Sequence, residues 1–106
     1  GVADATGIEE LMRDLLDEVD FAFGSGELQG VGPGNSASHR ADAFMNMLYS
    51  TNDLIAAGEI EAACEQIWQA YLRLDGAHRP PDFVEGPTTD GIGLLIFDVM
   101  DALECP

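Results

Sequence analysis

The chain has 106 residues, 46% of them hydrophobic, and carries 20 acidic residues against four arginines and no lysine, a formal net charge of −16. This length suits one domain, and the apolar content excludes a disordered acidic tail. Because phosphate binding needs clustered Lys and Arg, the charge argues against nucleic acid or an anionic membrane as partner. The best local candidate for a membrane span, residues 92–99, is far too short to cross a bilayer and contains Asp98.

A first helix is predicted over residues 7–23. Thr6 and Glu9 have the spacing of a capping box, in which both side chains satisfy N–H groups at the start of a helix. Residues 24–26 contain two glycines that end this helix, and the glycine-rich residues 28–34 are predicted to form a loop. Its apolar stripe at helical spacing consists of Ile8, Leu11, Met12, Leu15, Val19 and Phe23.

Three further helices are predicted, over residues 36–57, 60–74 and 89–103. Asn35 or Ser36 is expected to cap the second helix, and Thr88 or Thr89 the fourth. An irregular, proline-containing connection over residues 79–87 precedes the fourth. The apolar stripes of these helices are, in order, Ala37, Ala41, Phe44, Leu48 and Ile55; Ile60, Cys64, Ile67, Tyr71 and Leu74; and Ile92, Leu95, Ile96, Val99 and Leu103.

The two cysteines, Cys64 and Cys105, are predicted to form a disulfide. Four amphipathic helices with mostly short connections favour an all-α, antiparallel up-down four-helix bundle. In that bundle the start of the third helix, near Cys64, lies beside the end of the fourth, where Cys105 follows. A disulfide there would close a loop of about 40 residues and contribute about 4 kcal/mol. The alternative is two unrelated buried thiols, which are common in cytosolic proteins.

The chain also resembles a known family over nearly its whole length. The residues that carry the resemblance are Leu16-x-x-Val19, Gly26-x-Leu28 and Gly32-x-Gly34-Asn35, then Gly58-Glu59-x-Glu61-Ala62-Ala63-Cys64-Glu65-Gln66-Ile67 and Tyr71, and finally Leu95-Ile96-x-x-Val99-x-x-Ala102-Leu103-x-Cys105. This pattern is similar to that of FIMAH-like small helical domains, which sit at the C-terminus of large secreted bacterial and archaeal proteins. The resemblance implies an extracellular, non-catalytic appendage with a binding role, and it implies no catalytic residues.

The acidic residues form no recognisable catalytic or metal site. Those of the first predicted helix fall on its outer face, and a small bundle offers no evident cleft for a catalytic carboxylate pair. The acidic turns at residues 75–76 and 88–91 lack the pattern of a calcium loop. His39 and His78 have no partner at metal-binding spacing. We therefore expect no enzyme, no cofactor and no specific metal site, beyond weak, diffuse calcium binding.

Among the apolar residues outside the predicted core stripes, we single out Phe21, Leu54, Leu94 and Phe97. One interpretation is an irregular bundle in which the fourth helix is the most enclosed. The other is a docking surface for a neighbouring domain or for a second copy of the chain. We take Leu94 and Phe97 as the first candidate contacts.

These observations predict a non-catalytic interaction or anchoring module of an exported or cell-surface multidomain protein. Its partner would be a neighbouring domain, or a protein or glycan at the cell surface, with self-association as a further outcome. The acidic surface fits a salty or calcium-rich exterior, where cations screen its self-repulsion. The alternative is an acidic inhibitor that mimics nucleic acid and blocks a DNA-binding protein. Because the chain opens Gly-Val-Ala-Asp without an initiator Met, we expect it to be part of a longer protein.

Overall fold

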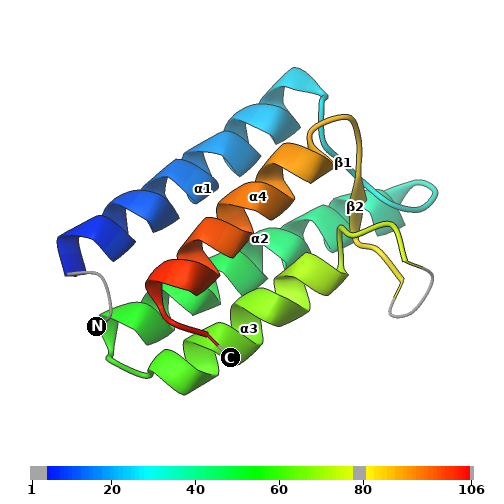
Figure 1. The fold of residues 1–106 in the computed structure, drawn as a ribbon. Helices are drawn as coiled ribbons and strands as arrows, with labels where there is room; N and C mark the ends of the chain where they lie inside the picture. The colour runs from blue at the N-terminus through cyan, green and yellow to red at the C-terminus, as the bar shows by residue number, and fades with distance from the viewer. Residues whose placement is uncertain (1–4, 78–80, 106) are drawn as a thin grey trace.

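The computed structural model describes residues 5–77 and 81–105, and this part of the chain is mostly helical (Figure 1). Its helices are α1 (Ala5–Ser25), α2 (Asn35–Ala56), α3 (Ile60–Leu72) and α4 (Thr89–Ala102), and two short strands are β1 (Gln29–Gly30) and β2 (Val84–Glu85). The four predicted helices are confirmed, each to within two residues at either end, which is the ordinary uncertainty of a helix boundary.

The predicted apolar stripes supply most of the core. Residues from every helix are fully or almost fully buried: Ile8, Met12, Leu15, Val19, Phe44, Leu48, Cys64, Ile67, Leu74, Ile92, Ile96, Val99 and Leu103. Each large side chain buried in this way contributes about 1.5–3 kcal/mol of transfer free energy. Thr51 is buried as well, and its hydroxyl donates to the Met47 carbonyl one turn earlier, at 2.9 Å. Helical periodicity therefore identified most of the interior, although some stripe residues, Tyr71 and Leu95 among them, are only half-buried.

The four helices associate mainly in two pairs. α2 packs chiefly against α3, and α1 packs chiefly against α4, with fewer residues in contact between α3 and α4. Figure 1 shows α1 and α4 side by side, with the chain after α4 turning back to the first turns of α3. α3 is therefore packed less closely against α4 than against α2.

The two strands were not predicted, because residues 28–34 were expected to form a loop. β1 and β2 pair antiparallel, with Gly30 opposite Val84, and Leu28 and Val84 bury their side chains beside this pair. Gly30 lies against the Ala37 carbonyl at the start of α2, where any Cβ would overlap that oxygen. Strands of two residues are too short to show a period of two in the sequence.

The predicted helix caps are wrong in their details. Gly34 occupies the N-cap position of α2, and no side chain caps this helix. Thr88 does occupy the N-cap position of α4, but its hydroxyl donates to the Glu27 carbonyl at 2.9 Å and so ties α4 to the turn after α1. The Thr89 hydroxyl donates to the Gly86 carbonyl at 3.1 Å. The side chain of Thr6 and residues 78–80 lie outside the described residues.

The connection between α3 and α4 is organised around Arg73. Its carbonyl accepts hydrogen bonds from the N–H groups of Phe83 and Val84, at 2.8 and 3.3 Å. Its guanidinium donates to the Pro81 carbonyl at 2.9 Å and lies 4.3 Å from the centroid of the Phe83 ring, a cation–π contact. These contacts position β2, and β2 in turn leads directly into α4.

Candidate binding surface

Most of the large apolar side chains that remain exposed are aromatic. The described residues of this kind are Phe21, Tyr49, Trp68, Leu94 and Phe97. Three of them, Trp68, Leu94 and Phe97, belong to α3 and α4, which pack less closely against each other than α3 packs against α2. Exposed apolar side chains that lie close together often mark an interaction site, because they lower the solubility of a domain that has no partner to cover them.

Three of the rings on this side form one continuous aromatic cluster, Trp68, Tyr71 and Phe97. The ring centroids of Trp68 and Tyr71 are 5.3 Å apart and the rings are stacked at 25°. Tyr71 and Phe97 are 4.7 Å apart and tilted at 47°, so the half-buried Tyr71 bridges the two helices. Gly93 on α4 lies beside the Tyr71 ring, where a Cβ would make an ordinary van der Waals contact at 3.4 Å.

Two hollows flank the aromatic cluster. The larger, the disulfide hollow, has a volume of about 650 Å³ and is lined by Ile60, Glu61, Cys64, Glu65, Trp68, Met100, Leu103, Glu104 and Cys105. The smaller, the Leu94 hollow, has a volume of about 280 Å³ and is lined by Tyr71, Leu74, Asp75, Thr89, Asp90, Gly93, Leu94 and Phe97. We call these two hollows together with the aromatic cluster the α3–α4 seam.

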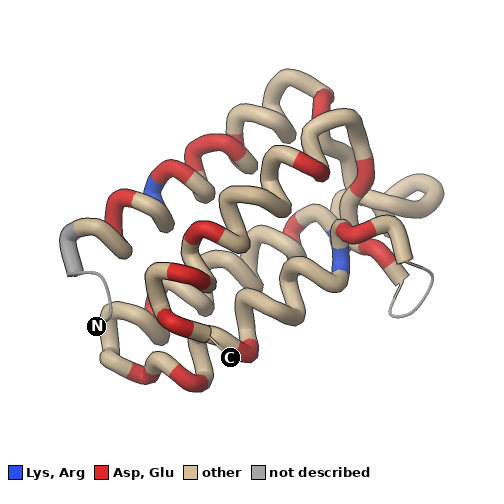
Figure 2. Tube along the Cα trace, viewed as in Figure 1, with Lys and Arg blue, Asp and Glu red and all other residues tan. Residues whose placement is uncertain are grey.

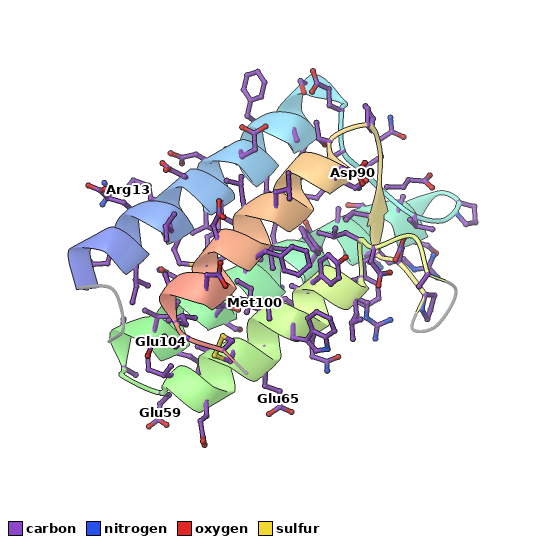
Figure 3. All side chains as sticks on the ribbon, viewed as in Figure 1. Arg13, Glu59, Glu65, Asp90, Met100 and Glu104 are labelled. Atoms are coloured by element: carbon purple, nitrogen blue, oxygen red, sulfur yellow. A yellow bond between two sulfur atoms is a disulfide. The ribbon has the colours of Figure 1, made fainter. Side chains whose placement is uncertain are left out.

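The disulfide closes one end of this seam. Cys64 and Cys105 are bonded, with their Cα atoms 5.5 Å apart, and they are 41 positions apart in the chain. Figure 3 shows the sulfur atoms between α3 and the C-terminal residues, with Met100, Glu104 and Glu65 around them. The predicted disulfide is thereby confirmed, and it forms part of the wall of the larger hollow.

The rims of the seam are acidic. Glu61, Glu65 and Glu104 line the disulfide hollow, and Asp75 and Asp90 line the Leu94 hollow, while neither hollow has a basic lining residue. Figure 3 places Glu104 and Asp90 at opposite ends of α4. Figure 2 shows that acids occur on every helix, so the seam differs from the rest of the surface in its exposed rings more than in its sign of charge.

A third hollow lies between α1 and α2 and has a mixed character. Its volume is about 560 Å³, and it contains Arg13 beside Asp17 and Glu9. Tyr49 is the large exposed ring there, without a second ring against it among the aromatic contacts of the described residues. This hollow therefore offers neither a continuous apolar surface nor a single sign of charge.

The four residues proposed from the sequence are not all brought together. Leu94 and Phe97 lie in the seam, at 66% and 40% exposure. Phe21 lies on α1, outside both hollows of the seam, and Leu54 is half-buried and packs against the core. Sequence reasoning missed Trp68 and assigned Tyr71 to the core. A signal for Trp68 was present, because it follows Ile67 and so falls off the predicted stripe.

The described residues contain no group of three or more His, Cys, Asp or Glu side chains placed to hold a metal ion. His39 is exposed on α2, and His78 lies outside the described residues. Weak calcium binding to the acidic surface stays a prediction. Of the helices in residues 5–77 and 81–105, none combines the length and the apolar character needed to cross a membrane.

Comparison with protein-family models, with curated proteins and with solved structures finds no match for this chain. The resemblance to FIMAH-like domains is therefore still a prediction from the sequence. The function has to be argued from the α3–α4 seam itself.

Proposed function

We propose that this chain is a non-catalytic interaction module that binds its partner through the α3–α4 seam. The observation that carries the proposal is the aromatic cluster of Trp68, Tyr71 and Phe97, which stays partly exposed beside Leu94. Aromatic side chains dominate the energetics of protein interfaces, because they bury a large area at a small cost in conformational entropy. A domain without a partner gains little from keeping these rings at its surface.

We further propose that the module acts outside the cell or at the cell surface, as part of an exported multidomain protein. The Cys64–Cys105 disulfide supports this, because disulfides persist mainly in oxidising compartments. The resemblance to FIMAH-like domains points in the same direction. An antiparallel up-down bundle is the architecture we propose for the helices, since the disulfide joins the first turns of α3 to the end of α4.

The test compares two double variants that each remove two exposed large apolar side chains. L94S/F97S changes the seam, whereas F21S/Y49S removes exposed rings from α1 and α2, where the wild-type residues are 67% and 51% exposed. Wild type and both variants are immobilised and presented with the extracellular and cell-envelope fractions of the organism that makes the protein. Each retained component is then purified and titrated against the free domain. Circular dichroism checks that both variants are folded.

The expected result is a component that binds wild type and F21S/Y49S and is lost with L94S/F97S. Loss of about 2 kcal/mol or more is typical when buried aromatic contacts are removed from an interface. If every retained component binds L94S/F97S as well as wild type, the seam is not the binding surface and the proposal is wrong.

Nucleic-acid mimicry is the second candidate, and the occurrence of acids on every helix is the observation that favours it (Figure 2). Mimicry depends on ordered carboxylates and not on the exposed rings. It therefore predicts that a basic DNA-binding protein is retained equally by all three versions of the domain and is displaced by DNA.

A further inference from the structure

Resting on the proposed function, we propose that the occupant of the α3–α4 seam is a basic amphipathic helix of another protein. Its apolar face would lie over the aromatic cluster, and its Lys or Arg side chains near both ends would meet the acidic rims. The proposal follows from the order of chemistry along the seam, which runs acidic, apolar, acidic.

The middle of the seam is apolar and partly exposed, with the two hollows on either side of it. Trp68 and Phe97 stand on the two sides, and Tyr71 lies between them as the half-buried floor. Leu94 and Met100 continue the apolar lining on α4 towards the two hollows. An amphipathic helix binds an exposed apolar surface by placing against it side chains at spacings of three and four residues.

The two acidic rims are separated by the length of α4. α4 has 14 residues, so Asp90 near its start and Glu104 beyond its end are about 20 Å apart. A partner helix laid along α4 spans the same distance in about four turns. Basic residues in its first and last turns would therefore reach Asp75 and Asp90 at one rim, and Glu61, Glu65 and Glu104 at the other.

The backbone conformation at Glu104 is one that residues with a side chain rarely adopt. Glu104 has φ 57°, in the left-handed region where helix ends usually carry Gly. It also follows the C-terminus of α4, where the helix dipole favours a cation over an anion. A basic side chain from a partner would meet the negative end of the helix dipole here.

The charge also decides against other occupants. A second copy of the chain would bring another −16 to a seam whose rims are already acidic. Polyanions are repelled for the same reason. A neutral glycan could stack on the rings, but it would gain no ion pairs from the acids at both ends.

The test selects binders without prescribing their composition. A displayed library of random peptides of about 16 residues, enough for four helical turns, is selected on the wild-type domain. Peptides that also bind L94S/F97S are removed by counter-selection. Because that variant has the wild-type net charge, this step discards peptides held by long-range attraction alone.

The surviving peptides are expected to carry Lys or Arg near both ends and an apolar stripe at helical spacing between them. Their affinity is then measured for two variants that each lose three acids. E61Q/E65Q/E104Q neutralises the rim of the disulfide hollow, and E10Q/D14N/E18Q neutralises exposed acids of α1. The rim variant should bind about tenfold more weakly, and the α1 variant should stay close to wild type.

Two outcomes of the peptide experiment overturn this inference. One is a selected pool with no excess of Lys and Arg over the starting library. The other is an equal effect of the two charge variants, which would mean that only the net charge matters. The proposed function fails separately. If the capture experiment yields a glycan or an acidic protein that needs Leu94 and Phe97 for binding, the proposed interaction module is supported. The proposal that its partner is a basic helix is then wrong.

Discussion

The two ends of the α3–α4 pair are held together by different kinds of contact. At the start of α3, a single covalent bond joins Cys64 to Cys105. At the other end, Arg73 holds the connection that leads to α4, and the Thr88 hydroxyl attaches the start of α4 to Glu27. Between these ends the aromatic cluster is left partly exposed. We infer that these end contacts limit how closely α3 and α4 approach, which leaves the rings between them partly exposed.

The largest effect is expected from removing the disulfide at the start of α3, which we call the covalent end of the pair. C64A/C105A should lower the free energy of unfolding by about 4 kcal/mol, because the disulfide closes a loop of 41 positions. Denaturant unfolding of the oxidised protein and of the double variant measures this difference. Wild type in the presence of a reductant is the control and should match the variant. A loss below about 1 kcal/mol would show that packing alone fixes this end.

The opposite end of the pair, held by the hydrogen bonds of Arg73 and Thr88, is its non-covalent end. One added methyl group there should lower the free energy of unfolding nearly as much. Gly86 has φ 143°, and a Cβ there would overlap the Glu27 carbonyl that also accepts the Thr88 hydroxyl. G86A should therefore cost about 3 kcal/mol through backbone strain and overpacking together. G24A is the matched control, because a Cβ at Gly24 in α1 meets nothing within 4 Å. Equal thermal stability of G86A and wild type would contradict the close approach seen here.

These two ends also differ in how far the sequence predicts them. The disulfide follows from helical periodicity and connection length, which place Cys64 and Cys105 at ends that meet. The contact of Thr88 with Glu27 joins residues 61 positions apart through a turn and has no periodic signal. The β1–β2 pair is of the same kind, because it depends on where α1 and α4 place their ends.

The candidate binding surface was predictable only in part. Leu94 and Phe97 stand out because they fall off the apolar stripe of α4, and Phe21 gives the same signal from α1. Periodicity tells which face of a helix is apolar, but it does not tell which neighbour lies beside that face or how closely. The role of Tyr71 depends on that spacing, since it becomes a bridge to Phe97 only because α3 and α4 are set apart.

A stabilising change is expected at the covalent end. E104G places Gly in the left-handed conformation that Glu104 now holds, with φ 57°. The substitution should raise the free energy of unfolding by about 1 kcal/mol, the strain removed less the added freedom of Gly in the unfolded chain. Denaturant unfolding of E104G and E104A separates backbone from side chain, because only Gly relieves the strain. If E104A stabilises as much as E104G, the carboxylate and not the backbone is responsible.

The smallest effect concerns Asp82 at the non-covalent end. Its Oδ2 accepts a hydrogen bond from the Gly76 N–H at 3.0 Å, and its Oδ1 is buried without a hydrogen-bond partner among the described residues. Burial raises the pKa of Asp82 above its ordinary value of 3.8, and the nearby Asp75 and Glu85 add to this, while the Gly76 N–H and Arg73 oppose it. The folded protein thus holds this proton more tightly than the unfolded chain does.

The sign of the pH dependence follows from that difference. As the pH rises from about 4 through the raised pKa, ionisation of Asp82 lowers the stability of the folded state. D82N cannot ionise and keeps an oxygen that can accept from Gly76, so it should be more stable than wild type at pH 7. The gain should stay below about 1 kcal/mol because the side chain is only half-buried, and it should shrink as the pH falls towards 4.

The measurement is the melting temperature of wild type, D82N and the exposed control D14N between pH 4 and pH 7. D14N accounts for the general relief of negative charge. If D82N is instead less stable than D14N at pH 7 and this difference closes on acidification, the ionised Asp82 carboxylate strengthens the connection, which is then held by charge as well as by hydrogen bonds.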